Sequence, residues 1–404
     1  MYKSLLNPSP YPPSQASRRP LIKIPVSIIL LILIVLGLQF LILPNYLYRN
    51  TPAAENLSQF HLNQLAAGLE KCTDFNTPPI SYALPSSSSS RKNPRWNPVS
   101  GQNETVLLKN AILFDGDTIL SGLVDVEFKE GIISSVSSAS NSQAEILDVK
   151  VLDVEGRYVT PGLVDLHSHH FLYSWPSLRA SDDTNEVHLK SGPLTPFVRA
   201  WDSIKAYDPA AAVIASGGVT TSLLLPGSAN IMGGEGILVK NLARDGEHSE
   251  PVVEDLLLEH GIPEKERRRY LKMACGENPR GVYSHTRMGN AWLFREQMTR
   301  AKELREKQDA WCLSAAAVRE SNDVSAISAF MTQSLKDGGL PEELELDSTL
   351  AMLRGKIGIN IHCYESEDIE DMLHHSKEFG FRIQAFHHAL DAWEVPELIK
   401  DSGE

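Results

Sequence analysis

The sequence predicts an α/β protein in which strands and helices alternate, preceded by a small β domain and one membrane-spanning helix. Three observations predict this organisation. Segment 25–43 is apolar and free of charge, region 104–160 contains short β-rich runs separated by glycine turns, and region 161–404 alternates apolar runs with helix-like stretches. Because such alternation is typical of a parallel sheet, region 161–404 is expected to form a (β/α) barrel or a doubly wound sheet.

Segment 25–43 is predicted to cross a membrane, because a helix of this length spans about 28 Å, close to the thickness of a bilayer core. Four basic residues lie in the tail at 1–24, whereas only Arg49 follows closely behind the segment. By the positive-inside rule the tail is cytosolic and the rest is lumenal or extracellular. We therefore expect a single-pass type II membrane protein with an uncleaved signal anchor.

The region behind the anchor, 44–103, is rich in Pro, Ser and Asn, and its composition predicts a stem without a packed core. Glycosylation sequons begin at Asn56 and Asn103, on the side of the membrane where N-glycosylation occurs. The four cysteines of the chain suit an oxidising compartment but are too sparse to form a disulfide framework. Their pairing is not readable from the sequence.

The β-rich region, 104–160, has Asp-Gly or Glu-Gly turn signals at 115–116, 130–131 and 155–156, which predict a small antiparallel domain. Beyond it, strand-like runs are expected at 162–166, 218–226, 237–241, 270–277, 356–364 and 381–389. Helix-like stretches are expected at 290–307, 309–335, 342–352 and 367–379.

Histidines lie at the C-terminal ends of three predicted strands: His167 and His169 after the first, His362 in the fifth, and the pair 387–388 in the sixth. Residues i and i+2 of a strand point to the same side. A parallel barrel gathers its C-terminal strand ends at one mouth, so these imidazoles are expected to meet there and bind a metal ion. The competing interpretation is scattered structural histidines. His374 and His375, on a predicted helix, are expected at the surface.

Region 104–404 resembles the amidohydrolase superfamily, in particular its imidazolonepropionase-like branch. The resemblance is carried, in the order of the family, by the blocks PGLVDLHSHH, GVTTSLLLPGSANIMGGEG, GENPRGVYSHTRMG, NIHCYESEDI and AFHHALDAWEVPELI. It implies a metal-dependent barrel of the TIM type, with a small β-sandwich domain built from both ends of the chain.

The resemblance also implies a set of metal ligands, which are His167, His169, His362 and His388. His387 is the alternative to His388, whose surroundings fit the family pattern better. Some relatives bridge two metals with a carboxylated lysine or a glutamate, and the candidates for such additional ligands are Lys272, Glu277 and Glu235. Ordinary polarity at strand ends is the competing interpretation of these three.

Neutral imidazoles suit a divalent metal, zinc first and iron as the alternative. Such an ion activates water and polarises a carbonyl group, so the resemblance implies hydrolysis of carbon–nitrogen bonds in small-molecule amides or lactams. The net charge of −13 disfavours nucleic acid as a partner, and a homo-oligomer is compatible with the sequence.

In the family, an Asp at the end of strand eight moves the proton, but the sequence stops at Glu404, just after the predicted sixth strand. No residue of the chain takes that catalytic role. We therefore expect an incomplete barrel of strands one to six, as in a truncated product or a partial gene model.

Two other functions are compatible with the sequence. A membrane-tethered binding protein would have kept the ligand pocket and lost the chemistry. A type II glycosyltransferase would share the tail, span and stem, and could use Asp115 and Asp117 as a metal-binding DxD motif. A tight turn is the preferred interpretation of that motif, because Asp-Gly favours turns.

Overall fold

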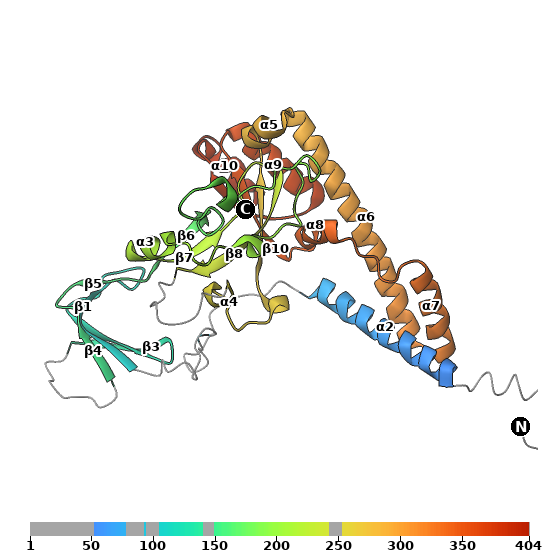
Figure 1. Cartoon of the computed structure of the whole chain (residues 1–404), viewed down its shortest axis with the longest axis horizontal. Coiled ribbons are helices and arrows are strands. Elements are labelled where there is room, and N and C mark those ends of the chain that lie inside the picture. The colour runs from blue at the N-terminus through green and yellow to red at the C-terminus, as the bar shows by residue number, and fades with distance from the viewer. Residues whose placement is uncertain (1–51, 78–92, 94–104, 140–148, 242–252, 404) are drawn as a thin grey trace, which may run out of the picture.

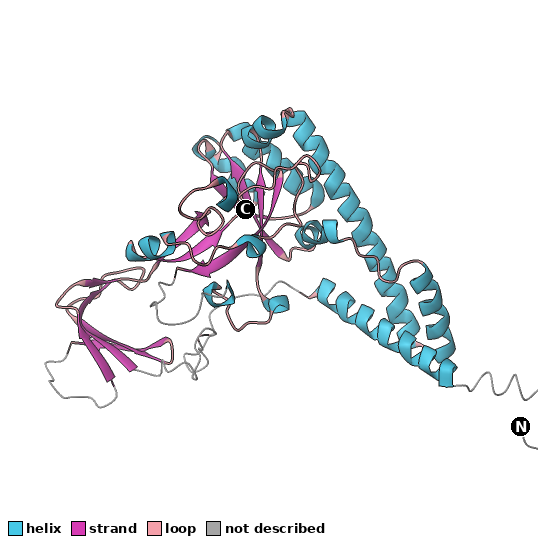
Figure 2. Cartoon of the chain, in the orientation of Figure 1, coloured by secondary structure: helices cyan, strands magenta, loops and turns pink. Residues whose placement is uncertain are grey.

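A computed structural model describes residues 52–77, 93, 105–139, 149–241 and 253–403. The molecule has three parts: a small β-sheet, a six-stranded sheet covered by helices, and an arm of three helices that projects from the covered sheet (Figure 1). Strands occur in the two sheets, and the arm is entirely helical (Figure 2).

The small sheet contains β1 (Thr105–Leu113), β2 (Val124–Lys129), β3 (Ile132–Ser138), β4 (Val149–Asp153) and β5 (Tyr158–Val159). The first three strands form an antiparallel meander, as predicted, but β4 and β5 pair with β1 in parallel. The expectation of a purely antiparallel domain is therefore wrong. The reason is that β4 lies on the far side of β1 from β2, so it is not joined to its neighbour by a hairpin.

The DxD motif of the glycosyltransferase hypothesis lies in the turn after β1. One carboxylate oxygen of Asp115 accepts hydrogen bonds from the backbone N–H groups of Asp117 and Thr118, at 2.9 and 2.8 Å. This is the geometry of an Asx turn, in which the aspartate caps its own backbone. The motif is thus explained by local structure.

The large sheet contains the six predicted strands in the order β11-β10-β9-β8-β7-β6. Their bounds are β6 (Leu163–Ser168), β7 (Val219–Leu224), β8 (Met232–Lys240), β9 (Arg269–Ala274), β10 (Ile357–Cys363) and β11 (Ile383–His388). β8 runs antiparallel to both its neighbours, and the other five strands share one direction. Uninterrupted parallel alternation is therefore wrong, because the link 225–231 between β7 and β8 is too short for a crossover helix.

Helices cover the outer face of the large sheet. They are α5 (Glu277–Tyr283), the first half of α6 (Arg287–Glu320), α8 (Asp347–Leu353), α9 (Ser366–Phe379) and α10 (Pro396–Ser402). Leu271 and Met273 of β9 and Ile359 and Ile361 of β10 join the main core beneath them. Two short helices, α3 (Ala210–Ser216) and α4 (Val253–Leu256), lie beside β7 and β8 (Figure 1). Short 3₁₀ turns occur at Arg179–Ser181, Ala200–Ser203, Glu264–Glu266, Leu344–Leu346 and Ala392–Glu394.

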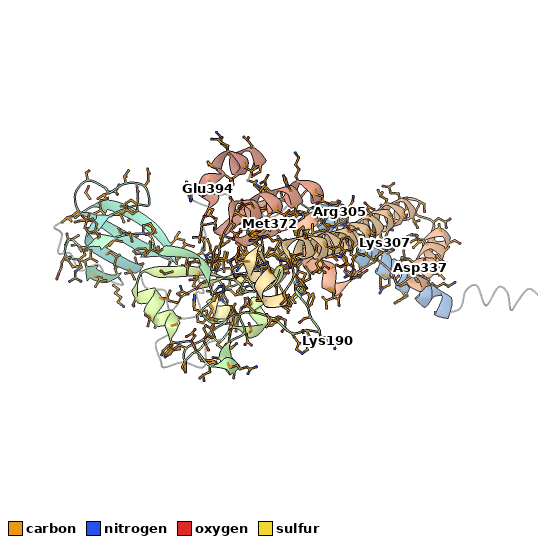
Figure 3. The ribbon with its side chains drawn as sticks, turned by 90° about the horizontal axis from the view of Figure 1, so that it is seen from above. Lys190, Arg305, Lys307, Asp337, Met372 and Glu394 are labelled. Carbon is orange, nitrogen blue, oxygen red and sulfur yellow. A yellow bond between two sulfur atoms is a disulfide. The ribbon has the colours of Figure 1, made fainter. Side chains whose placement is uncertain are left out.

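The arm consists of α2 (Pro52–Asn76), the second half of α6, and α7 (Val324–Lys336). Arg305 and Lys307 of α6 lie along it, and Asp337 lies at the end of α7 (Figure 3). The predicted helix break near 308 is wrong, because α6 continues to Glu320 and the chain turns at 321–323, where Asp323 caps the next helix.

The predicted stem is partly helical, because α2 buries apolar side chains in the arm. Leu65 packs with Ala315, Ile327 and Met331, and the Cys72–Cys312 disulfide ties α2 to α6. The amphipathic helix was not predicted, because the region as a whole is rich in Pro and Ser.

No helix of residues 52–77 or of the other described ranges is long and apolar enough to cross a membrane. The predicted tail and span, 1–43, lie outside the described residues. Asn103 lies outside them too, and Asn56 belongs to α2, but its side chain is not described.

Candidate metal centre

The five parallel strands end at one rim of the large sheet, and β8 begins there. The rim brings together His167, His169, His362 and His388. The ring centroid of His167 lies 5.0 Å from that of His169 and 4.5 Å from that of His388, and His362 lies 4.7 Å from His388. β6 and β11 are the two edge strands, yet His167 Nδ1 lies 2.8 Å from His387 Nδ1. The sheet is therefore curved into a near-barrel.

Strand alternation places the site on the inner face of this curved sheet. On β9 and β10 the odd-numbered residues face the helices, so Lys272, Asn360 and His362 face inward. β11 contains a bulge, since Ile359 pairs with Ile383 but Asn360 pairs with Ala385. The extra residue, Gln384, reverses the side of β11 to which the following side chains point, so that His387 points toward Asn360.

The hydrogen bonds of His169 determine which of its nitrogens carries the proton. Its Nδ1 lies 2.7 Å from the carbonyl oxygen of Leu225. A carbonyl oxygen only accepts, so Nδ1 carries the hydrogen and Nε2 presents a lone pair. That Nε2 lies 3.2 Å from His167 Nε2.

The hydrogen bonds of His387 determine, in the same way, which nitrogen of His167 carries the proton. Asn360 donates to the carbonyl of Gly358 and presents its side-chain oxygen to His387 Nε2 at 2.9 Å. His387 Nε2 therefore carries the hydrogen, and its Nδ1 accepts from His167 Nδ1. This leaves His167 Nε2 as a second lone pair, directed at that of His169.

Two lone pairs 3.2 Å apart repel each other unless a cation lies between them. Burial, followed by the charge of Lys272, lowers the pKa of His167 to about 2, and burial also lowers the pKa of His169. A proton is therefore not expected to bind between the two Nε2 atoms. Two imidazole nitrogens that bind one zinc ion at about 2.0–2.1 Å in a tetrahedral arrangement lie at a similar separation. This pair thus fits a metal ion.

His362 has the third set of contacts. Its Nε2 lies 3.0 Å from Glu277 Oε1 and 3.0 Å from the amide nitrogen of Asn278, which also donates to the hydroxyl of Ser228. His362 Nδ1 and Glu277 Oε2 are buried and have no hydrogen-bond partner in the described part of the chain. Two further polar atoms thus stand at the rim without a hydrogen-bond partner among the described residues.

Lys272 lies fully buried on the inner face, where its ammonium group donates to the carbonyl of Pro226 at 3.0 Å. Burial lowers the pKa of Lys272 to about 7. Its charge lowers the pKa of His167, His169, His362 and His387, so it lies close to the whole cluster.

No protein-family model matches the chain. It is 36% identical over 359 residues to the amidohydrolase tasK of Hapsidospora irregularis, an alignment that covers 84% of this chain and 34% of tasK. The crystal structure of an amidohydrolase from Thermotoga maritima superimposes with a TM-score of 0.57 at 28% identity, covering 73% of this chain and 67% of that one. Over the aligned residues the chain is homologous to these two amidohydrolases.

A shorter match, 36% identity over 64 residues, links this amidohydrolase homologue to a dihydroorotase of Syntrophus aciditrophicus (strain SB), covering 16% of the chain and 15% of that enzyme. The chain spans about a third of the length of tasK. The likeness to the Thermotoga maritima structure supports an amidohydrolase-like α/β fold.

Not every predicted residue of the amidohydrolase homologue reaches the rim. Glu235 faces the helices, where it pairs with Arg269 and accepts from the hydroxyl of Ser348, so it is not a candidate ligand. The expectation for His375 is also wrong. It is 1% exposed beneath Phe294, whereas His374 is exposed as predicted.

Sequence reasoning missed the supporting residues. Asn360 and Asn278 fix His387 and His362, and the ring of Tyr364 packs on His362 at 4.5 Å. Of these residues, only Asn360 could have been predicted, because strand alternation places it on the same face of β10 as His362. As the side chains stand, no three His, Cys, Asp or Glu residues among those described converge in an arrangement that could hold a metal.

Proposed function

We propose that this amidohydrolase homologue is a metal-dependent hydrolase that cleaves carbon–nitrogen bonds in small-molecule amides or lactams. Zinc, with iron as the alternative, would be held by His167, His169, His362 and His388. The observation that supports this most is the opposed pair of lone pairs on His167 and His169, each directed by a hydrogen bond on the opposite nitrogen.

The surrounding residues prepare the histidines for such an ion. Leu225 and His387 fix the tautomers of His169 and His167, which is the usual role of outer groups around a metal. His388 rather than His387 is proposed as the ligand, because both nitrogens of His387 are engaged by Asn360 and His167.

A bound divalent ion would lower the pKa of a water molecule and polarise the substrate carbonyl. The chain adds two groups that face this position. Glu277 offers a free carboxylate oxygen beside His362, and Lys272 offers an amine that burial leaves partly uncharged near neutral pH. Both are proposed as additional ligands.

The test is hydrolysis of a panel of amides and lactams by purified protein, before and after removal of the metal with a chelator. Any turnover should be lost when the metal is removed and restored by zinc. His169→Ala should lack turnover at any zinc concentration, whereas His374→Ala should match the wild type. Bound metal without turnover on the whole panel would instead support the tethered binding protein.

We also propose that the chain is anchored by residues 25–43, with the described part lumenal or extracellular. The support is that both cysteine pairs, Cys72–Cys312 and Cys275–Cys363, are disulfides, and such bonds persist in oxidising compartments. Glycans on Asn56 and Asn103 belong to the same proposal.

A further inference from the structure

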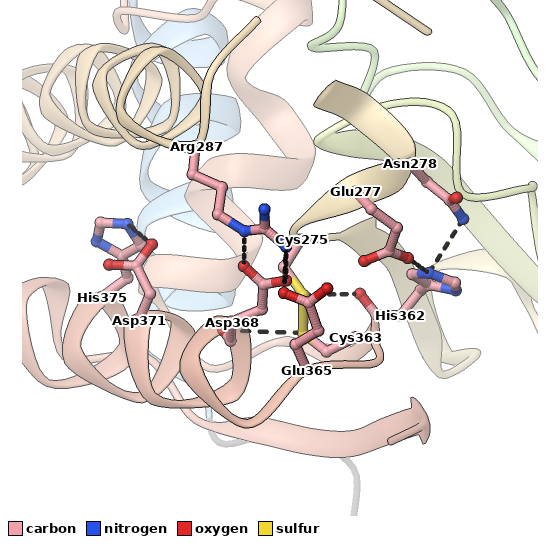
Figure 4. The surroundings of a disulfide bond; sticks show 10 residues. All are labelled: Cys275, Glu277, Asn278, Arg287, His362, Cys363, Glu365, Asp368, Asp371 and His375. Atoms are coloured by element: carbon pink, nitrogen blue, oxygen red, sulfur yellow. Dashed lines mark hydrogen bonds and ion pairs between the residues drawn. A yellow bond between two sulfur atoms is a disulfide. The ribbon is translucent and has the colours of Figure 1, made fainter. Parts of the chain in front are cut away.

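The Cys275–Cys363 disulfide lies close to His362, with Cys363 on the outer face of the sheet (Figure 4). It joins the ends of the neighbouring strands β9 and β10. Cys363 follows His362, and Cys275 precedes Glu277 by two residues. The backbone N–H of Cys275 also donates to the carbonyl of His362 at 2.9 Å. The bond therefore ties together the two segments that carry the His362–Glu277 contact.

A cavity of about 380 Å³ gives access to this disulfide between α6 and α9. Cys275 lines its wall, together with Phe294 and Met372, and the half-exposed side chains of Arg287 and Arg295 stand at its mouth. Cys275 is 9% exposed and Cys363 is fully buried. Of the two cysteines, Cys275 is therefore the one that a small reagent in this cavity can reach.

A second contact lies beside the disulfide. Arg287 forms two hydrogen bonds to Asp368, at 2.7 and 2.9 Å, and one to Glu365 at 2.6 Å (Figure 4). Gly276 has φ +65°, and a Cβ there would lie 2.0 Å from a carboxylate oxygen of Asp368. Because this contact persists without the disulfide, breaking the disulfide should loosen the rim but leave the fold intact.

We propose that Cys275–Cys363 is a redox-sensitive tie, and that a small thiol entering the cavity breaks it and thereby weakens the hold of His362 on a metal ion. The metal part of this inference rests on the proposed function. A thiolate attacks the sulfur of Cys275, forms a mixed disulfide there, and Cys363 leaves as a thiolate that takes up a proton. A second thiol then attacks the mixed disulfide, which yields the oxidised thiol and two protein thiols.

The experiment compares wild type, Cys72→Ser/Cys312→Ser and Cys275→Ser/Cys363→Ser, each incubated with reduced glutathione and then freed of it anaerobically. Peptide mass spectrometry should find glutathione on Cys275 and not on Cys363. Zinc affinity, measured by chelator competition, should fall about 10-fold or more in the first two proteins, the usual effect of losing an outer support. In Cys275→Ser/Cys363→Ser the zinc affinity should be low before thiol treatment and should not change on treatment.

Hydrogen–deuterium exchange at 274–278 and 361–364 supplies a readout that needs no metal. Exchange there should rise on thiol treatment of the wild type. If the oxidised protein binds no zinc, the proposed function fails, but a rise in exchange still supports the tie. Resistance of Cys275–Cys363 to the thiol, free thiols in untreated protein, or reduction that leaves both exchange and affinity unchanged would overturn the inference. If Cys275→Ser/Cys363→Ser does not fold, the thiol-treated wild type provides the same comparison.

Discussion

At the scale of single residues, the site depends on which nitrogen of each histidine carries hydrogen. Within the described ranges, no carboxylate contacts Nε2 of His167 or His169, and their Nδ1 atoms are both engaged, by His387 and by the Leu225 carbonyl. The chain thus directs two lone pairs at one point. The sequence predicted that His167 and His169 face one side, because i and i+2 alternate together. It could not predict the tautomers, which depend on Leu225 directly after β7 and on residues of β10 and β11.

Asn360 is expected to control the site although it is not a proposed ligand. Asn360→Ala removes the acceptor that fixes His387, so His387 no longer has to accept from His167. Zinc affinity should fall about 10-fold, as is usual for lost outer-shell partners. Chelator competition measures it, with Asn63→Ala on the exposed face of α2 as the matched control. Equal affinities of the two variants would contradict the tautomer assignment.

Lys272 is expected to make the stability of the metal-free protein depend on pH. Its pKa is about 7 in the folded state, against the ordinary lysine value of 10.5 in the unfolded chain, so unfolding takes up a proton between these values. The free energy of unfolding should therefore rise with pH from about 7 to about 10, by at most about 1.4 kcal/mol per pH unit.

Denaturant titrations of chelator-treated protein across this range measure the effect. Lys272→Met should lack the rise, since it has no group to titrate. A wild-type slope that matches the slope of Lys272→Met would show that the lysine keeps its charge in the fold.

At the scale of elements, all six strands of the large sheet were predictable, because apolar runs of strand length separate its helices. The antiparallel direction of β8 was not predicted, although the short link 225–231 between β7 and β8 determines it. The bulge in β11 was beyond sequence reasoning, because Gln384 is recognised as an extra residue only from the pairing with β10. For the same reason, the choice between His387 and His388 stayed open until β11 was placed.

The arm shows why α2 was missed and how its packing can be tested. Leu65 is fully buried between α6 and α7, so Leu65→Ala should lower the free energy of unfolding by about 3 kcal/mol. Leu313→Ala, on the exposed side of α6, should change it by less than about 0.5 kcal/mol. Thermal and denaturant unfolding measure both, and equal effects would contradict the packing of the arm.

At the scale of the whole molecule, α2 begins nine residues after the predicted span, and the arm continues into the covered sheet through α6. If the span orients the chain as proposed, the arm and both sheets are lumenal or extracellular. Glycosidase treatment should then lower the mass of the expressed protein, and Asn56→Gln with Asn103→Gln should abolish the shift. Full protease sensitivity of the C-terminal part in sealed microsomes would contradict this topology.

The central claim is that four histidines from three strands hold one metal ion at the rim. Elemental analysis of purified protein tests it most directly, with His167→Ala, His362→Ala and the surface variant His374→Ala measured side by side. We expect about one zinc or iron ion per chain in the wild type and in His374→Ala, and a sharp loss in the other two variants. If His374→Ala loses as much metal as His167→Ala, or if the wild type holds none, the claim is wrong.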